Sequence, residues 1–132
     1  MKTKTLTLNN AKLTVKVANS PSEQAQGLMN IASLPENEGM LFCYPKEDKL
    51  TFWMKSTPTP LSIAFFDKNK KIIQIEDLQP YDETGVTSNE PAKWALEVNK
   101  GWFDKNNIKI GDKFGIIGPL GVKIRIFRKK KQ

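Results

Sequence analysis

The chain has 132 residues, of which 39% are hydrophobic and 27% are charged, and its formal net charge is +7. A chain of this length and composition is expected to form one globular domain with its own hydrophobic core. It contains no histidine and one cysteine, Cys43. This excludes histidine-based acid/base catalysis, Ser–His and Cys–His nucleophile pairs, histidine-ligated metals, an intramolecular disulfide and cysteine-cluster metal sites. We therefore expect no metal and no cofactor.

The basic residues are concentrated at the end of the chain, at Arg128–Lys131. We expect residues 1–128 to form a single domain and residues 129–132 to be a disordered basic tail. No apolar run approaches the roughly 18 residues that cross a bilayer, so no transmembrane segment is expected. No apolar segment follows the basic start at Met1–Lys4, so the chain as it stands is assigned to the cytoplasm. A leader removed from a longer chain would instead make the protein extracytoplasmic. We expect a monomer.

The first elements are a hairpin and a short helix. Thr5–Leu8 and Lys12–Val17 alternate apolar and polar residues, which is typical of half-buried strands, and the two asparagines between them favour a tight turn. Ser20 and Glu23 have the spacing of a capping box, which predicts a helix over about Pro21–Met29. Ala25, Leu28 and Met29 would share the buried face of this helix.

The remaining elements are mostly short strands separated by turn residues. We expect the following sequence: strands at Gly39–Tyr44, Thr51–Met54, Leu61–Phe66, Lys71–Leu78 and Ala92–Val98, one or two helical turns within Gly101–Asn107, and strands at Lys113–Ile117 and Val122–Arg128. The segment Gln79–Pro91 has neither a helical nor a strand pattern, so we expect a functional or mobile loop. These elements predict a mainly β fold, a compact β-barrel-like or rolled sandwich domain with one or two short peripheral helices.

Several stretches together resemble one known family. They are Gly27–Met29, Gly39–Phe42, Phe52–Thr57, Pro60–Leu61, Leu96–Glu97, Gly101 and Ile110–Asp112. In order and spacing they are similar to the bacterial and archaeal family known as domain of unknown function 192, over about Thr5 to Arg128. The resemblance implies a compact β-barrel-like domain with small helices, and no particular activity, because none is settled for the family. The chain departs from the family in having Ser56 in place of the usual Asn and Ser62 in place of the usual Asp.

The candidate site lies in the polar connector Lys55–Pro60, which separates two apolar runs. Alternation places Trp53 and Lys55 on one side, away from Phe52 and Met54. An aromatic face beside an ammonium and two hydroxyls can hold a small polar ligand. The predicted ligand-binding set is therefore Trp53, Lys55, Ser56, Thr57 and Glu97, the last being the acid of another stretch that resembles the family.

Three functional hypotheses and one structural interpretation remain open at this point. The first hypothesis is a binding or accessory domain that recognises a small molecule, a glycan or a peptide segment. The second is a small hydrolase or transferase that uses Lys55 and Glu97. The third is nucleic-acid association through the basic C-terminal strand and tail, which the separation of aromatic from basic residues makes the weakest. In the structural interpretation, Trp53 is part of the core, Lys55 pairs with Glu97, and Ser56 and Thr57 bind backbone groups.

Overall fold

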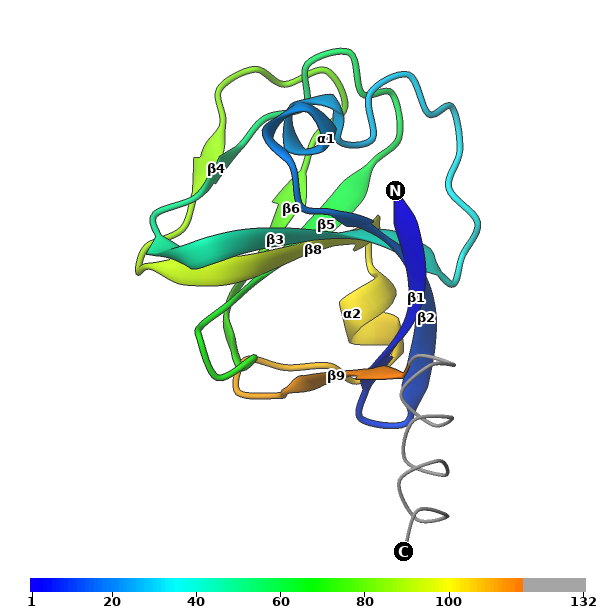
Figure 1. Ribbon diagram of the computed structural model, residues 1–132. Helices are drawn as coiled ribbons and strands as arrows, with labels where there is room; N and C mark the ends of the chain where they lie inside the picture. Colours follow the sequence, from blue (N-terminus) through cyan, green and yellow to red (C-terminus); the bar gives the residue numbers. More distant parts are fainter. Residues whose placement is uncertain (118–132) are drawn as a thin grey trace, which may run out of the picture.

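The computed structural model describes residues 1–117, which form nine strands and two short helices (Figure 1). The elements are β1 (Lys2–Leu8), β2 (Ala11–Ala18), α1 (Pro21–Gln26), β3 (Glu38–Asp48), β4 (Thr51–Phe52), β5 (Leu61–Phe66), β6 (Ile72–Leu78), β7 (Val86–Thr87), β8 (Ala92–Asn99), α2 (Trp102–Lys105) and β9 (Phe114–Ile117). The predicted mainly β fold with short helices is confirmed. The expected strand Val122–Arg128 and the basic tail lie outside the described residues.

Seven strands form one sheet in the order β6-β5-β8-β3-β2-β1-β9, and β4 pairs with β7 separately. Neighbouring strands are antiparallel except β2 and β3, which are parallel. A parallel pair needs a long crossover connection, and here α1 and the loop that follows it provide one. This crossover places α1 over β3 and β8, where it helps to cover one face of the sheet (Figure 1).

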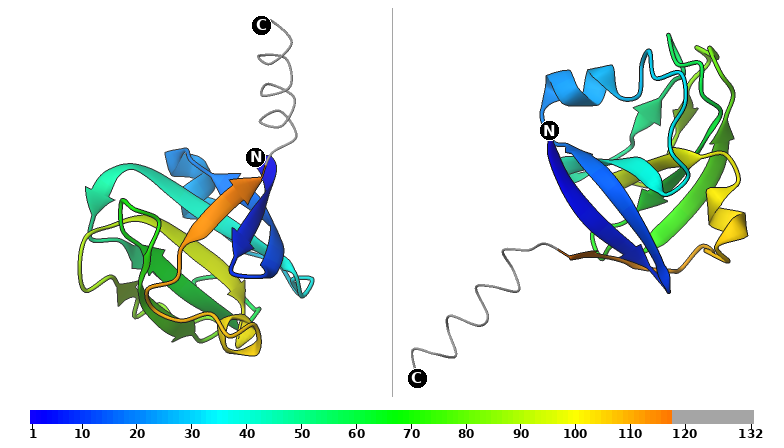
Figure 2. Two further views of the ribbon diagram at one scale, coloured as in Figure 1. Left: turned by 90° about the horizontal axis from the view of Figure 1, so that it is seen from below. Right: turned by 90° about the vertical axis from the view of Figure 1, so that its right-hand side faces the viewer.

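The sheet curls until its two outer strands approach each other, which gives the molecule its barrel-like shape (Figure 2). An isolated bridge joins Lys71 to Lys113, between the start of β6 and the start of β9. The backbone N–H of Ile72 donates to the carbonyl of Asp112 at 2.9 Å, and that of Phe114 donates to Lys70 at 3.1 Å. Since β6 and β9 do not pair along their length, the barrel is nearly closed rather than continuous.

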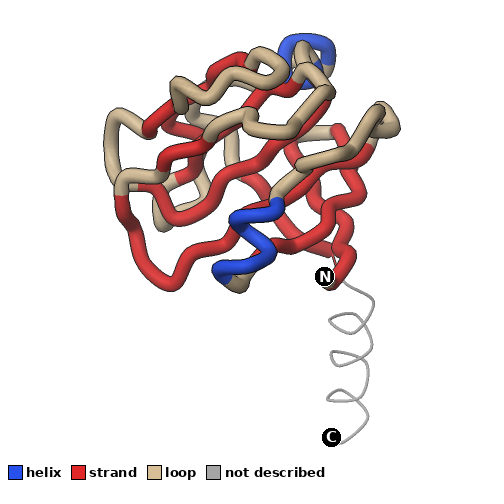
Figure 3. The backbone as a smooth tube through the Cα atoms, turned by 90° about the horizontal axis from the view of Figure 1, so that it is seen from above, coloured by secondary structure: helices blue, strands red, loops and turns tan. Residues whose placement is uncertain are grey.

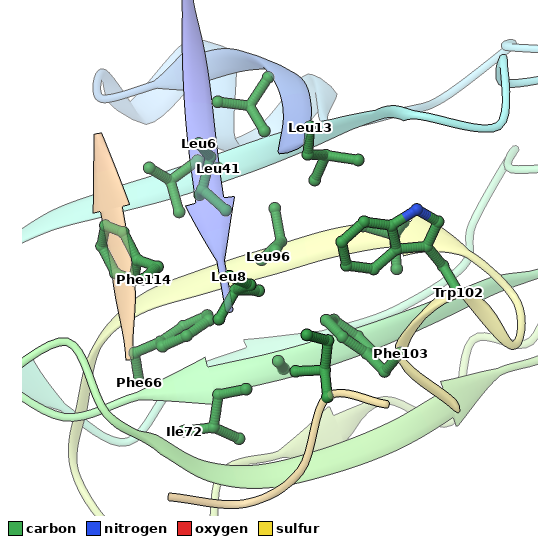
Figure 4. Close-up of a cluster of buried hydrophobic side chains, with 14 residues drawn as sticks. Leu6, Leu8, Leu13, Leu41, Phe66, Ile72, Leu96, Trp102, Phe103 and Phe114 are labelled. Atoms are coloured by element: carbon green, nitrogen blue, oxygen red, sulfur yellow. The ribbon is translucent and has the colours of Figure 1, made fainter. Parts of the chain in front are cut away.

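Two hydrophobic cores lie on opposite faces of the curled sheet. The barrel core is enclosed by the curl and by α2 (Figure 4); its buried residues include Leu6, Leu13, Phe66, Leu96, Trp102, Phe103 and Phe114. The outer core lies between the other face and the layer of loops that carries α1 and β4 (Figure 3); it includes Leu28, Met40, Phe42, Phe52, Met54, Ile63 and Phe65. Both faces of β5 are therefore buried, as its two-sided apolar pattern predicts.

The predicted N-terminal hairpin and helix cap are both confirmed. Leu8 pairs with Ala11 across the turn, and Asn9 adopts a φ of 53°, a conformation that asparagine tolerates well. In α1, the Ser20 hydroxyl accepts from the Glu23 backbone N–H, and the Glu23 carboxylate accepts from the Ser20 N–H, which completes a capping box.

Two elements are shorter than the sequence predicts. Helix α1 ends at Gln26 because Gly27 has a φ of 48°, and no residue within the helix is buried. Leu28 reaches the outer core from the loop that follows. Strand β4 contains two residues, and its partner β7 lies within the segment that was expected to be an irregular loop. Among residues 1–117, neither helix is long and apolar enough to span a membrane.

Candidate functional site

The connector Lys55–Pro60 is a tight turn closed by its own hydrogen bonds. The backbone N–H of Thr57 donates to the carbonyl of Met54 at 3.1 Å, and the Thr57 hydroxyl donates to the carbonyl of Lys55 at 2.9 Å. Ser56, between them, has a φ of 54°, in the left-handed region that favours Gly and Asn. The turn brings the Thr57 side chain inward, where it is buried, and leaves the side chains of Lys55 and Ser56 exposed.

The connector is attached to the loops on both sides of it. These hydrogen bonds are Met54 N–H to Asp82 carbonyl (2.7 Å), Tyr81 N–H to Thr57 carbonyl (3.1 Å), Asn30 N–H to Ser56 carbonyl (2.8 Å) and Thr59 hydroxyl to Ile31 carbonyl (2.6 Å). The loop after α1 therefore binds one side and the loop after β6 binds the other. Because the connector is held at both sides, Thr57 has a fixed position relative to the sheet below it.

A cavity of about 160 Å³ lies between α1, the connector and the face of the sheet formed by β3 and β8. Its lining residues are Gln24, Ala25, Gln26, Gly27, Leu28, Met29, Phe42, Tyr44, Thr51, Phe52, Trp53, Met54, Thr57 and Glu97. We call it the Glu97 cavity, because Glu97 is the single acid in its lining. The lining contains neither Lys nor Arg.

Glu97 is a carboxylic acid placed in the outer core. It lies on β8 opposite Met40 of β3 and Ile63 of β5, and its side chain is 4% exposed. Burial alone raises the pKa of Glu97 to about 8, and no cation or hydrogen bond from residues 1–117 opposes that effect. The carboxyl group is therefore largely protonated at neutral pH.

Tyr44 brings a second titratable side chain to the Glu97 cavity, from the strand next to β8. Burial raises the pKa of the Tyr44 hydroxyl to about 12, with smaller contributions from the negative charges of Glu97 and Cys43. The phenol is thus neutral throughout the physiological range and can donate or accept a hydrogen bond. Gln24 of α1 lies on the same cavity, and its amide donates to the carbonyl of Cys43 at 2.7 Å, which holds α1 against β3.

The five predicted site residues divide into two groups. Trp53, Thr57 and Glu97 all line the Glu97 cavity. Lys55 and Ser56 are exposed and lie outside its lining. The Lys55 ammonium sits 5.4 Å from the centroid of the Trp53 ring, a cation–π distance.

Trp53 is 48% exposed and stands at the rim of the cavity, with Phe52 and Met54 buried on either side of it in the chain. The predicted alternation in this stretch is confirmed, and the interpretation of Trp53 as a core residue is wrong. The other two tryptophans belong to the barrel core, where Trp94 packs on Phe114 and Trp102 is buried. They lie on the opposite face of the sheet from Glu97, so they do not extend the aromatic rim.

Gln24, Phe42 and Tyr44 line the cavity but are absent from the predicted set. Phe42 and Tyr44 could have been found, because they alternate along β3 and the strand is adjacent to β8. Nothing local marks Gln24, since its place on the cavity depends on how the crossover folds back over the sheet.

Ser62 lies outside the Glu97 cavity and connects β5 to β6 and to the start of α2. It is buried, its hydroxyl donates to the Asp77 carboxylate at 2.8 Å, and it accepts from the backbone N–H of Gly101 at 3.0 Å, just before α2. The two positions at which the chain departs from the family pattern, Ser56 and Ser62, thus have different partners and form no shared polar network in the described residues. Residues 1–117 contain no cluster of three or more acidic, Cys or His side chains that could hold a metal.

Comparisons with known proteins agree with this architecture. The family described as "Uncharacterized ACR", domain of unknown function 192, matches residues 4–116. A Sinorhizobium meliloti protein provisionally described as a transcription regulator is 30% identical, with a TM-score of 0.84, over 87% of this chain and 94% of its own. A Novosphingobium aromaticivorans protein of unknown function is 34% identical, with a TM-score of 0.78, over 86% of this chain and 83% of its own. The chain matches none of the curated proteins. It belongs to the family of domain of unknown function 192.

Proposed function

We propose that this protein is a small binding domain and that its ligand occupies the Glu97 cavity. The observation that carries the proposal is the carboxyl group of Glu97, which is buried, faces a cavity and has no partner among residues 1–117. A largely buried carboxyl group without a protein partner lowers the stability of the folded protein, because burial removes most of its contacts with water. A ligand that bonds to this group would recover that free energy.

The rest of the lining supports the same conclusion. The lining combines four aromatic rings with several polar side chains, and a concave site with converging polar groups is the usual character of a ligand site. Thr57 and Tyr44 add neutral hydrogen-bonding groups beside Glu97. A volume of about 160 Å³ is below the roughly 300 Å³ of sites for drug-sized ligands, so the site suits a small molecule or one side chain of a peptide.

The same geometry weighs against a hydrolase or transferase that uses Lys55 and Glu97 together. A nucleophile and its acid or base must lie within hydrogen-bond reach of a common reacting atom. Lys55 is exposed and lies outside the cavity lining, whereas Glu97 is buried and is part of that lining. Binding therefore remains the function that this cavity supports best.

The proposal can be tested by nuclear magnetic resonance with five small probes: n-butylammonium, 1-butanol, butyrate, N-methylacetamide and glucose. We expect at least one probe to shift the backbone amide signals of Gly27, Thr57 and Glu97, while signals of the barrel core near Leu8 stay unchanged. Thr57→Val should weaken that binding because it removes a hydroxyl from the lining. Ser56→Asn, next to it but outside the lining, is the matched control and should leave the binding unchanged. If no probe shifts the three cavity amides, the proposal is wrong.

A second candidate is nucleic-acid association, favoured by the provisional description of the Sinorhizobium protein as a transcription regulator and by the net charge of +7. Fluorescence anisotropy with labelled single-stranded and double-stranded oligonucleotides tests it. Association would give affinities that fall steeply with salt and that weaken when residues 129–132 are removed. Absence of binding at low salt would eliminate this candidate.

A further inference from the structure

When the Glu97 carboxyl group is ionised, the Glu97 cavity carries a charge opposite to that of the protein as a whole. The chain has 21 basic and 14 acidic residues, yet the cavity lining contains one acid and no Lys or Arg. A concave site lined by one sign of charge favours ligands of the other sign, and low-dielectric walls strengthen the effect. Within the lining, no positive group of the protein competes for the Glu97 carboxyl.

Aromatic rings complete the wall around this acid. Phe42, Tyr44, Phe52 and Trp53 all line the cavity, and Phe42 and Phe52 pack edge to face with ring centroids 4.9 Å apart. Aromatic faces attract ammonium ions, and protein sites for alkylated amines combine such rings. Trp53 already accepts one ammonium, that of Lys55, which shows that its ring is accessible to a cation.

We propose that the ligand of the Glu97 cavity is a small primary alkylamine in its protonated form, with the ammonium group bonded to the Glu97 carboxylate and the alkyl chain against the aromatic wall. This inference rests on the proposed binding function and specifies its ligand class. The carboxylate, in its ionised form, selects a cation, and the aromatic rings of the lining offer an apolar contact to the alkyl chain. Hydroxyl groups of Thr57 and Tyr44 are available to accept the other ammonium hydrogens.

Binding should release one proton, because the free cavity holds a protonated carboxyl group at neutral pH and the ammonium complex requires the carboxylate. Apart from Tyr44 on β3, the groups that surround Glu97 are not titratable: Ile63 on β5, Gln24 on α1 and Thr57 on the connector. Tyr44 stays neutral, since its pKa is about 12, and an alkylamine with the pKa of a lysine side chain stays protonated to about pH 10. The pKa of about 8 for Glu97 therefore sets the pH dependence.

The test compares n-butylammonium, 1-butanol and butyrate at equal ionic strength, with binding followed through the amide signals of Gly27, Thr57 and Glu97. We expect n-butylammonium to bind tightest, and its affinity to rise about tenfold per pH unit from pH 6 towards pH 8 and to level off above it. Glu97→Gln should abolish both the preference for n-butylammonium over the other two probes and the pH dependence of n-butylammonium binding. Glu97→Asp, which keeps the charge, should retain both in weaker form, and Ser56→Asn should behave as the unmodified protein.

Two results would overturn this inference and can be told apart from a failure of the binding function itself. If 1-butanol or butyrate shifts the cavity amides at least as strongly as n-butylammonium, the cavity binds ligands but is not selective for cations. If n-butylammonium binds equally well to the Glu97→Gln variant, the carboxylate is not its anchor. A failure of every probe to shift these amides would instead contradict the proposed binding function. Circular dichroism of each variant establishes that it is folded before its binding is compared.

Discussion

Glu97 on β8 lies directly opposite Met40 on β3, so a carboxyl group occupies a position whose cross-strand neighbour is a buried apolar side chain. On the other side, β5 presents Ile63 to the same group. An apolar residue would be expected at such a position of a sheet face covered by a second core. The carboxyl group costs stability there, and it is the one carboxyl group in the lining of the Glu97 cavity.

The pH dependence of stability should reveal this cost. The pKa of Glu97 is about 8 in the folded protein and near its ordinary value of 4.5 when the chain is unfolded, so the folded state holds a proton that the unfolded state releases between these values. Stability should therefore be highest below about pH 4.5, as far as this group is concerned, and fall as the pH rises towards 8. The loss should be on the order of a few kcal/mol.

Glu97→Gln is the variant that isolates this effect. The amide has the shape of the protonated acid and does not titrate, so the variant should equal the unmodified protein near pH 4 and exceed it in unfolding free energy near pH 8. Urea denaturation at the two pH values gives both free energies. Equal pH dependence in the two proteins would show that Glu97 does not titrate with a raised pKa.

A substitution at Ser56 should raise the stability of the protein without changing ligand binding at the Glu97 cavity. Its φ of 54° is costly for most residues and is better tolerated by Asn, so Ser56→Asn should raise the unfolding free energy by up to about 1 kcal/mol. Ser56→Val, a β-branched residue in the same conformation, should lower it by a comparable or larger amount. Urea denaturation of both variants and the unmodified protein at one pH gives the unfolding free energies to compare. An increase in stability with Val would contradict the left-handed conformation assigned to Ser56.

Ser62 should be important for stability although it lies outside the Glu97 cavity. Ser62→Ala removes the acceptor of the Gly101 N–H and the donor to Asp77, which should cost about 1–3 kcal/mol and leave binding at the cavity unchanged. Ser33→Ala is the exposed control and should stay within about 0.5 kcal/mol of the unmodified protein. A Ser62 variant as stable as the Ser33 variant would show that water replaces both hydrogen bonds.

Gly39 should be intolerant of any side chain because β8 passes close to it. A Cβ atom at position 39 would lie 2.6 Å from the backbone oxygen of Glu97 and 3.2 Å from Val98 Cγ1. Gly39→Ala should therefore destabilise the protein by at least 1–3 kcal/mol, a typical cost of overpacking. In Gly115→Ala, the control, the nearest contact is the movable Thr7 hydroxyl at 3.0 Å, and the melting temperature should fall less. Similar decreases for both variants would contradict this account of Gly39.

The sequence predicts those features that depend on neighbours along the chain. The hairpin at Asn9, the capping box at Ser20 and the two-sided burial of β5 all follow from local turn chemistry and periodicity. The alternation from Phe52 to Lys55 is also predicted, and it separates the buried residues from Trp53 at the rim.

Features that depend on contacts between distant segments could not be predicted in this way. Lys55 belongs to the same short stretch as Trp53 and Thr57, yet it is exposed and lies outside the lining of the cavity. Gln24 reaches the cavity because the crossover folds back over β3. No local sequence pattern predicts that folding back. Helix α1 likewise ends early because of the backbone conformation at Gly27, although the apolar spacing continues to Met29.

The most direct test of the account is the pKa of the Glu97 carboxyl group, measured in the ligand-free protein from its side-chain carbon signals between pH 4 and pH 10. The signal is assigned by its absence in Glu97→Gln. A buried carboxyl group without a partner should titrate near pH 8. Titration near pH 4.5 would show that solvent or another group already stabilises the carboxylate, and it would contradict the claim that Glu97 awaits a ligand.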